Sequence, residues 1–240
     1  MIGEELERIA NNYHVSQDPK DKFIEDISQQ YFCSWVQEKF SNNQYVCEMG
    51  YGEGNTARVL RHYFDEYTVI EGAASLVKKA RCDSPNITVI ETLFESFYPE
   101  KKFDLILALH VLEHVNEPIE ILRLMRKWIK PEGEIVILVP NKNSIHRLLA
   151  KEMGMIENLD DLSPRDYLVG HQRVYDLKEL KKDIDSAGFK VVNEAGFFLK
   201  PLPNSMMMEY DHELLIAMNS LSNVFPANLM ANICLTIKSI

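Results

Sequence analysis

Three glycines stand at alternate positions, Gly50, Gly52 and Gly54, directly after the apolar run 45–49. Glycine adopts positive φ easily and lets another molecule approach the main chain, because it has no side chain. The apolar run predicts a buried strand, and residues 55–64 predict a helix on the other side of the turn. Doubly wound α/β proteins use such a glycine turn to make room for nucleotide-like cofactors. The spacing therefore predicts a ligand that lies against bare backbone.

Acidic and imidazole side chains stand at the ends of later predicted strands. Glu71 ends the second strand, where a carboxylate accepts hydrogen bonds from the ribose hydroxyls of a nucleotide. His110 ends the fourth strand, and histidine is the natural general base near neutral pH. A dinucleotide dehydrogenase would have its third glycine at the position of Asn55. The pattern therefore argues against a nucleotide-dependent oxidoreductase, which stays an alternative.

Strands and helices alternate along the chain, as in proteins whose parallel sheet is covered by helices on both faces. Predicted helices cover residues 21–40, 55–64, 74–81, 118–129, 177–187 and 206–221, and predicted strands cover residues 45–49, 67–71, 87–90, 104–110, 134–140 and 232–237. The last strand is expected to be an antiparallel edge strand. The polar start of the chain predicts partly irregular structure.

We expect a single domain over residues 1–240. Within it we expect an N-terminal helical lid at 1–40, a cofactor-binding core at 41–140, a substrate-cap insertion at 141–175 and the C-terminal part of the sheet at 176–240. The insertion is polar and long, and such insertions in compact domains are more often functional than idle.

Composition excludes several classes of protein. The net charge of −10 disfavours nucleic-acid binding, which needs a basic surface. The four cysteines form no CxxC pair, so neither a disulfide framework nor a zinc site is predicted. Three adjacent methionines at 206–208 predict apolar packing, since they cannot face one ion from a helix. The first residues are acidic and have neither the basic start nor the apolar run of a signal peptide, and no apolar run has membrane-span length, so we expect a cytoplasmic protein without membrane insertion.

The pattern Glu48-x-Gly50-x-Gly52-x-Gly54, the acid Glu71 and the segment 108–115 (ALHVLEHV) together resemble the class I S-adenosylmethionine-dependent methyltransferases over residues 44–140. The resemblance implies an α/β fold with a Rossmann-like, doubly wound, mostly parallel seven-stranded sheet, an antiparallel edge strand and a helical cap. It implies S-adenosyl-L-methionine as the cofactor and S-adenosyl-L-homocysteine as the product.

The resemblance also implies which residues form the cofactor site. The residues expected there are Glu48, Gly50, Tyr51, Gly52, Glu71, Gly72, Leu93, Phe94, Leu109 and His110. Glu48 would fix the glycine loop or receive the amino group of the cofactor. Leu93 replaces the acid that usually reaches the adenine, so apolar packing by Leu93 and Phe94 is expected, with Glu95 as a helper. His110 would lie beside the sulfonium, and His114 would anchor the turn.

Beyond residue 140, segments at 141–147, 153–156, 170–175 and 196–200 resemble a subgroup of small-molecule O-methyltransferases, which includes phosphonate O-methyltransferases and enzymes encoded near cell-surface polysaccharide genes. This implies methyl transfer to an oxygen of a small, anionic acceptor: a phosphonate, a phosphoramidate or a sugar-linked compound. The catalytic candidates are His110, His171, Arg173 and His146, and the acceptor-binding candidates are Tyr13, His14, Tyr51, His146, His171, Arg173, Tyr175 and Lys200.

Several alternatives stay open. Arg173 and Lys200 could clamp an anionic acceptor, since guanidinium and ammonium groups bind phosphate-type oxygens, or they could lie at the surface. The Tyr51 ring could project into the acceptor site or fold over the start of the next helix. The acceptor atom could be nitrogen or carbon, and a non-catalytic cofactor-binding module is a third function class. The expected partner is a small-molecule acceptor, with the chain a monomer or a homodimer.

Overall fold

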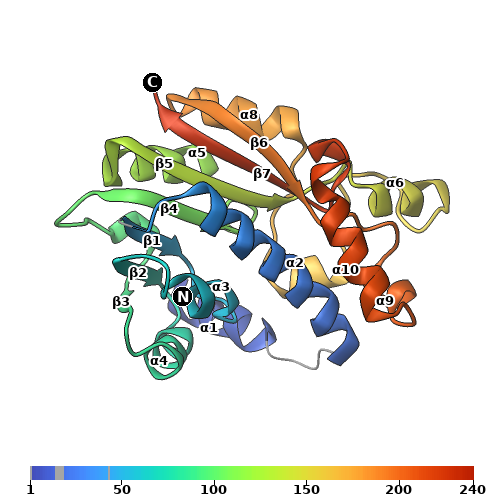
Figure 1. Ribbon diagram of the computed structural model, residues 1–240, viewed down its shortest axis with the longest axis horizontal. Coiled ribbons are helices and arrows are strands. Elements are labelled where there is room, and N and C mark those ends of the chain that lie inside the picture. Colours follow the sequence, from blue (N-terminus) through green and yellow to red (C-terminus); the bar gives the residue numbers. More distant parts are fainter. Residues whose placement is uncertain (1, 14–18, 43) are drawn as a thin grey trace.

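The computed structural model describes residues 2–13, 19–42 and 44–240 and contains a seven-stranded sheet (Figure 1). Its strands are β1 (Tyr45–Met49), β2 (Glu66–Glu71), β3 (Thr88–Glu91), β4 (Phe103–Leu109), β5 (Ile129–Pro140), β6 (Phe189–Phe197) and β7 (Asn232–Ser239). Their order across the sheet is β3-β2-β1-β4-β5-β7-β6. Strands β1 to β5 pair in parallel, and β7 pairs antiparallel with both β5 and β6.

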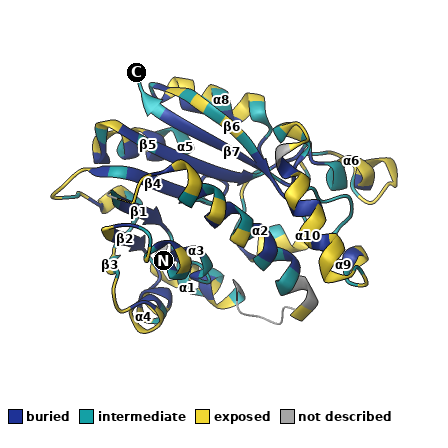
Figure 2. Ribbon diagram, in the orientation of Figure 1, coloured by how far each residue is buried: buried dark blue, intermediate teal, exposed yellow. Residues whose placement is uncertain are grey.

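Helices cover both faces of the sheet. They are α1 (Ile2–Tyr13), α2 (Pro19–Lys39), α3 (Asn55–Leu60), α4 (Ala74–Asp83), α5 (Pro118–Trp128), α6 (Ile145–Glu152), α7 (Pro164–Leu168), α8 (Leu177–Ser186), α9 (Asn204–Met207) and α10 (His212–Ser220). Side chains of α5 and α8 pack on one face, and side chains of α2, α3 and α4 pack on the other. Figure 2 shows that the middle strands are buried along most of their length.

Alternation within the strands explains the two apolar layers. In β1, Val46 faces the α2 and α3 layer, and Cys47 faces the α5 and α8 layer. Both residues are fully buried, as expected for a parallel strand with helices on both sides. The chain leaves β1 toward β2 and β3 and later returns to β4 on the other side. A crevice outside the carboxyl ends of β1 and β4 is therefore the expected ligand position in a sheet of this kind.

The predicted fold class is confirmed, with corrections in detail. Residues 2–13 form helix α1, where partly irregular structure was expected. The last strand is antiparallel as predicted, but β6 lies outside it and takes the edge of the sheet. Strand β6 was missing from the predicted strands, and the helix expected at 206–221 is split into α9, α10 and a short 3-10 turn at Leu221–Asn223. Among the described residues, no helix has the length and apolar character needed to cross a membrane.

Candidate functional site

The glycine loop leaves open space in front of its first two glycines. Gly50, Gly52 and Gly54 have φ values of 80°, 51° and 77°, in the region that side chains disfavour. A Cβ atom added at Gly50 or Gly52 would meet no atom within 4 Å. At Gly54 it would lie 2.2 Å from the ring of Tyr51. The first two glycines therefore leave room for a ligand, and the third makes room for a side chain of the protein.

Tyr51 corrects one expectation. Its side chain is only 3% exposed and belongs to the apolar layer under α2 and α3. The ring lies against Gly54 at the start of α3, and Lys79 Nζ lies 5.6 Å from the ring centroid. The ring thus folds over the start of the helix, which was the alternative interpretation. It does not project toward an acceptor, so only the backbone of Tyr51 belongs to the site.

Glu71 holds the ends of three elements together. One carboxylate oxygen accepts a hydrogen bond from the backbone N–H of Tyr51 at 2.9 Å, and the other accepts one from Ala73 at 2.7 Å. The side chain is 7% exposed. Burial raises its pKa, and the hydrogen bonds from Ala73 and Tyr51 oppose the rise. Each carboxylate oxygen keeps a further lone pair, so Glu71 can also accept a ligand hydroxyl.

Glu48 points into the protein. Its carboxyl group accepts a hydrogen bond from the Tyr67 hydroxyl at 2.7 Å, and the side chain is buried. Burial raises the pKa of Glu48 to about 8, although the Tyr67 hydrogen bond lowers it. The Glu48 side chain therefore links β1 to β2 through Tyr67, and its two expected roles, at the glycine loop or at the amino group of the cofactor, stay predictions.

Helix α1 lies across the carboxyl edge of the sheet. A Cβ atom at Gly72 would lie 3.0 Å from Leu6 of α1 and 3.2 Å from Leu93, so Leu93 lies beside the end of β2, and its packing against an adenine stays a prediction. Phe94 starts a 3-10 turn and packs, partly buried, against the layer of α5. Leu109 packs, also partly buried, against the opposite layer.

The same helix reaches the cap insertion. Asn12 donates a hydrogen bond to the carbonyl of Leu168 at 3.1 Å, and a Cβ atom at Gly170 would lie 2.6 Å from Ile9. That the N-terminal segment acts as a lid stays a prediction. The side chain of Tyr13 and the whole of His14 lie outside the described residues, so their expected roles stay predictions.

His110 stands immediately after β4 in a strained backbone conformation. Its φ of 54° is uncommon for a residue with a side chain and is typical of functional positions. Nδ1 lies 2.9 Å from Oε1 of Glu113, whose side chain is fully buried while that of His110 is 38% exposed. Desolvation lowers the pKa of His110, but the hydrogen bond and charge of Glu113 outweigh it and raise the pKa. His110 lowers the pKa of Glu113 in return, against the effect of burial.

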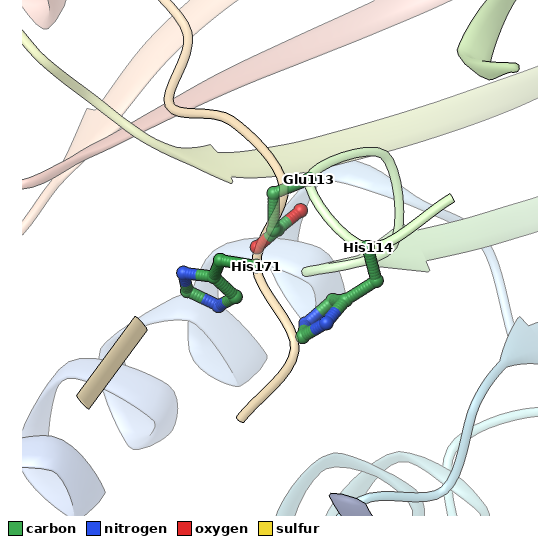
Figure 3. A group of neighbouring side chains, drawn as sticks. All are labelled: Glu113, His114 and His171. Atoms are coloured by element: carbon green, nitrogen blue, oxygen red, sulfur yellow. The ribbon is translucent and has the colours of Figure 1, made fainter. Parts of the chain in front are cut away.

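His171 comes from the cap and faces His114, which follows Glu113 in the chain (Figure 3). The two imidazole rings have centroids 4.6 Å apart at an interplanar angle of 76°. Nδ1 of His171 lies 2.8 Å from Oδ1 of Asp166. Asp166 also forms the capping box of α7 with Ser163, and its pKa is well below the usual range despite burial. Burial lowers the pKa of His114 to about 4.

Asp166 and Glu113 were missed as site residues. Glu113 stands in the quoted motif, and its position three residues after His110 is the signal that could have identified the pair. The pairing of Asp166 with His171 depends on how the cap folds. The only local signal is Ser163 followed three residues later by an acid, which is typical of a helix start.

Arg173 and Tyr175 do not lie free to bind an acceptor, which corrects two further expectations. The Arg173 guanidinium donates to the carbonyls of Leu112 at 2.7 Å, of Asn116 at 3.3 Å and of Val115. It therefore holds the turn that carries Glu113 and His114. Tyr175 is 3% exposed, and its hydroxyl donates to Asp183 at 3.1 Å. Its ring is part of the core.

His146 lies in helix α6 of the cap, and Lys200, which follows β6, lies close enough for its charge to act on the His146 ring. Burial lowers the pKa of His146 to about 3, and the charges of Lys200 and Arg147 add to this. Nδ1 of His146 is buried and has no hydrogen-bond partner among the described residues. Lys200 Nζ lies 5.9 Å from the Phe198 ring centroid. These two residues remain acceptor-side candidates.

The residues at this edge fit S-adenosylmethionine. Gly50 and Gly52 leave backbone open to close approach, and Glu71 presents acceptor oxygens beside them. Leu93 and Gly72 form an apolar surface beside the end of β2, next to the expected cofactor position. The loop, Glu71 and Leu93 would hold the cofactor, which supplies an electrophilic methyl group when bound.

Known proteins are similar to this chain over most of its length. A trans-aconitate 2-methyltransferase from Escherichia fergusonii is 25% identical over 139 residues, which are 57% of this chain and 55% of that protein. The match therefore spans about half the length of this curated relative. An S-adenosylmethionine-dependent methyltransferase from Thermotoga maritima has the same fold, with a TM-score of 0.66, 14% identity and 99% coverage of both chains.

The N-methyltransferase NodS from Bradyrhizobium japonicum, solved with S-adenosyl-L-homocysteine, aligns with a TM-score of 0.60 and 13% identity, over 99% of this chain and 97% of that one. These two structural similarities support the fold alone. The family of methyltransferase domains matches residues 22–194, which is more than half of the chain. The chain therefore belongs to the methyltransferase-domain family, whose cofactor is S-adenosylmethionine.

Proposed function

We propose that this protein transfers the methyl group of S-adenosylmethionine to a hydroxyl oxygen of a small anionic acceptor, with His110 as the general base. The observation that carries the proposal is the pair of His110 and Glu113, 2.9 Å apart, at the carboxyl end of β4. Strand β4 pairs with β1, which leads into the glycine loop. The imidazole therefore stands directly after the strand that pairs with β1, near the cofactor loop.

Glu113 orients the base. With Nδ1–H donated to the Glu113 carboxylate, the neutral ring carries its free lone pair on Nε2. Nε2 can then take the proton of an acceptor hydroxyl as the oxygen attacks the methyl carbon. General-base catalysis of this kind contributes about 10²–10⁴-fold. Alignment of the acceptor oxygen with the methyl group contributes more, up to roughly 7–11 kcal/mol.

The cap would recognise the charge of the acceptor. Lys200, which follows β6, lies close enough to the uncharged His146 of the cap for its charge to act on that ring, and we propose it as the cation for a carboxylate, phosphonate or sugar-linked phosphate. The relative named for trans-aconitate, a carboxylate anion that has no hydroxyl group, supports the anionic charge of the acceptor but not the hydroxyl. Arg173 takes no part in the clamp, because its guanidinium is committed to the turn after β4.

A product screen tests the proposal. Purified protein is incubated with S-adenosylmethionine and a panel of hydroxylated carboxylates, phosphonates and nucleotide sugars, and methylated products are identified by mass spectrometry with fragmentation. We expect an O-methyl product from an anionic acceptor. A product screen that yields only methylated amines would overturn the assignment of oxygen as the acceptor atom. Methyl transfer to nitrogen is the second candidate function, because the structurally similar NodS is an N-methyltransferase.

The variant His110→Asn tests the base. Asparagine tolerates the positive φ of this position better than most residues, so the backbone is preserved while the base is lost. We expect kcat to fall by about 10²–10⁴-fold while the affinity for S-adenosyl-L-homocysteine stays unchanged. The exposed His62, substituted by alanine, is the control. An unchanged kcat in His110→Asn would exclude the base role.

A further inference from the structure

We infer that Glu113, His114 and His171 bind a divalent transition-metal ion of the Zn²⁺ type. One possible ligand atom from each residue lies within 4.8 Å of the others, and the three side chains converge in Figure 3. Two imidazoles and one carboxylate form the ligand set of many protein-bound first-row metal ions. The sequence predicts no metal site, because the four cysteines form no CxxC pair and the three adjacent methionines cannot face one ion.

The buried carboxylate provides the second observation. Oε1 of Glu113 is paired with His110, whereas Oε2 is buried without a hydrogen-bond partner among the described residues. The side chain of Glu113 is fully buried. A buried carboxylate oxygen without a partner costs folding free energy, so natural proteins rarely keep one. A cation at this position would satisfy it.

Both histidines are held as metal ligands usually are. A ligating imidazole normally donates its other N–H to a carboxylate or a backbone carbonyl, which fixes the ring. Nδ1 of His171 is paired with Asp166 at 2.8 Å, which leaves Nε2 for the ion. His114 hydrogen-bonds with the backbone of Gly170, one residue before His171.

The spacing suits a small cation. Bond lengths of about 2.0–2.2 Å around a tetrahedral ion separate the ligand atoms by roughly 3.3 Å. The observed limit of 4.8 Å requires a contraction of at most about 1.5 Å, which side-chain rotations can supply. The ion would join the turn after β4 to the cap, since His171 is the only one of the three ligands that belongs to the cap. This inference does not depend on which atom the enzyme methylates.

Equilibrium dialysis with metal analysis tests the site. The protein carries no histidine tag and has the exposed free thiol removed by Cys82→Ser. After chelator treatment it is dialysed against Zn²⁺ or Mg²⁺ and analysed by mass spectrometry. We expect about one Zn²⁺ per chain and no retained Mg²⁺, which prefers oxygen ligands in octahedral geometry. Less than about one tenth of an ion per chain would overturn the inference.

Variants locate the ion. His171→Ala and Glu113→Gln should abolish Zn²⁺ retention, and Asp166→Asn should weaken it by about 10–100-fold through loss of ring orientation. His62→Ala should bind as the parent does. Folding is checked independently by circular dichroism and by S-adenosyl-L-homocysteine binding. If Glu113→Gln fails to fold, His171→Ala, which changes only the cap, decides the question. Equal retention in His171→Ala would overturn the site.

A thermal shift gives a second readout. Zn²⁺ at about 100 times its Kd should raise Tm by roughly 5–10 °C in the parent protein. It should leave Tm unchanged in His171→Ala. The same shift in both proteins would mean that the ion binds elsewhere.

Discussion

The carboxylate of Glu71 accepts a hydrogen bond from the backbone N–H of Tyr51 at 2.9 Å, so the end of β2 holds the glycine loop in place. The second oxygen of Glu71 binds the N–H of Ala73 at 2.7 Å, at the start of α4. One buried side chain therefore fixes the loop and the neighbouring helix start together. We propose that its remaining lone pairs accept hydrogen bonds from a cofactor that lies against Gly50 and Gly52.

Loss of the Glu71 carboxylate should weaken cofactor binding. Hydrogen bonds to a charged group contribute about 1.5–3 kcal/mol, so Glu71→Ala should reduce the affinity for S-adenosyl-L-homocysteine by about 10–100-fold. Isothermal titration calorimetry measures this. Glu91→Ala is a matched control, because Glu91 is an exposed acid at the end of the adjacent strand β3, in register with Glu71. Equal affinity in both variants would remove Glu71 from the cofactor site.

A methyl group at Gly50 should block the cofactor without a clash inside the protein. A side chain at φ 80° costs about 1–2 kcal/mol of folding free energy. Gly154 in the cap has φ 69° and also meets no atom within 4 Å. Gly50→Ala and Gly154→Ala should therefore lose similar stability in urea denaturation, and only Gly50→Ala should lose affinity for S-adenosyl-L-homocysteine. If both retain it, the space at Gly50 does not receive the ligand.

Arg173→Ala should act through the turn after β4. Its removal leaves carbonyls of that turn without a donor, which should lower the free energy of unfolding by roughly 1–3 kcal/mol. Arg173→Lys should not rescue the protein, because an ammonium cannot reproduce the planar fork. Catalytic loss should be the same for neutral and anionic acceptors. The control is Arg165→Ala, an exposed residue 3.5 Å from Glu25.

A selective rise of KM for anionic acceptors in Arg173→Ala, with stability unchanged, would contradict this prediction. It would return Arg173 to the acceptor clamp that its residue type had suggested. Urea denaturation and steady-state kinetics on the same preparations separate the two outcomes.

The layout of the sheet could be predicted from sequence because buried parallel strands are continuous apolar runs with turns at both ends. The run of β4, for example, is apolar at nearly every position and ends at Leu109, directly before His110. Carboxyl ends of parallel strands meet at one edge, so Glu71 and His110 were expected there before any contact was known. Strand β6 escaped prediction because its exposed side carries polar residues such as Lys190 and Glu194, and no continuous apolar run marks it.

The site beyond the strand ends depends on tertiary packing that residue types do not encode locally. Arg173 has the chemistry of an anion clamp, but three backbone carbonyls distant in sequence take its donors. The Tyr51 ring occupies the space that the missing side chain of Gly54 leaves, and it packs in the apolar layer under α2. The pairing of His171 with Asp166 appears only once α7 has folded across the cap.

Glu48 should make the stability of the protein depend on pH. Its pKa is about 8 in the folded protein, against an ordinary value of 4.5. Between these values the folded state keeps a proton that the unfolded chain has released. The free energy of unfolding should therefore fall as pH rises from about 5 to about 8, by up to about 1.4 kcal/mol per pH unit, and level off above that range.

Glu48→Gln should remove this dependence, because the amide oxygen still accepts the Tyr67 hydrogen bond but does not titrate. Urea denaturation without cofactor at several pH values between about 5 and 8 measures the free energy of unfolding of both proteins. The value for Glu48→Gln minus the value for the parent should increase as pH rises. Glu66→Gln, an exposed position on the neighbouring strand β2, is the control and should follow the parent. Parallel curves for the parent and Glu48→Gln would mean that Glu48 keeps an ordinary pKa despite its burial.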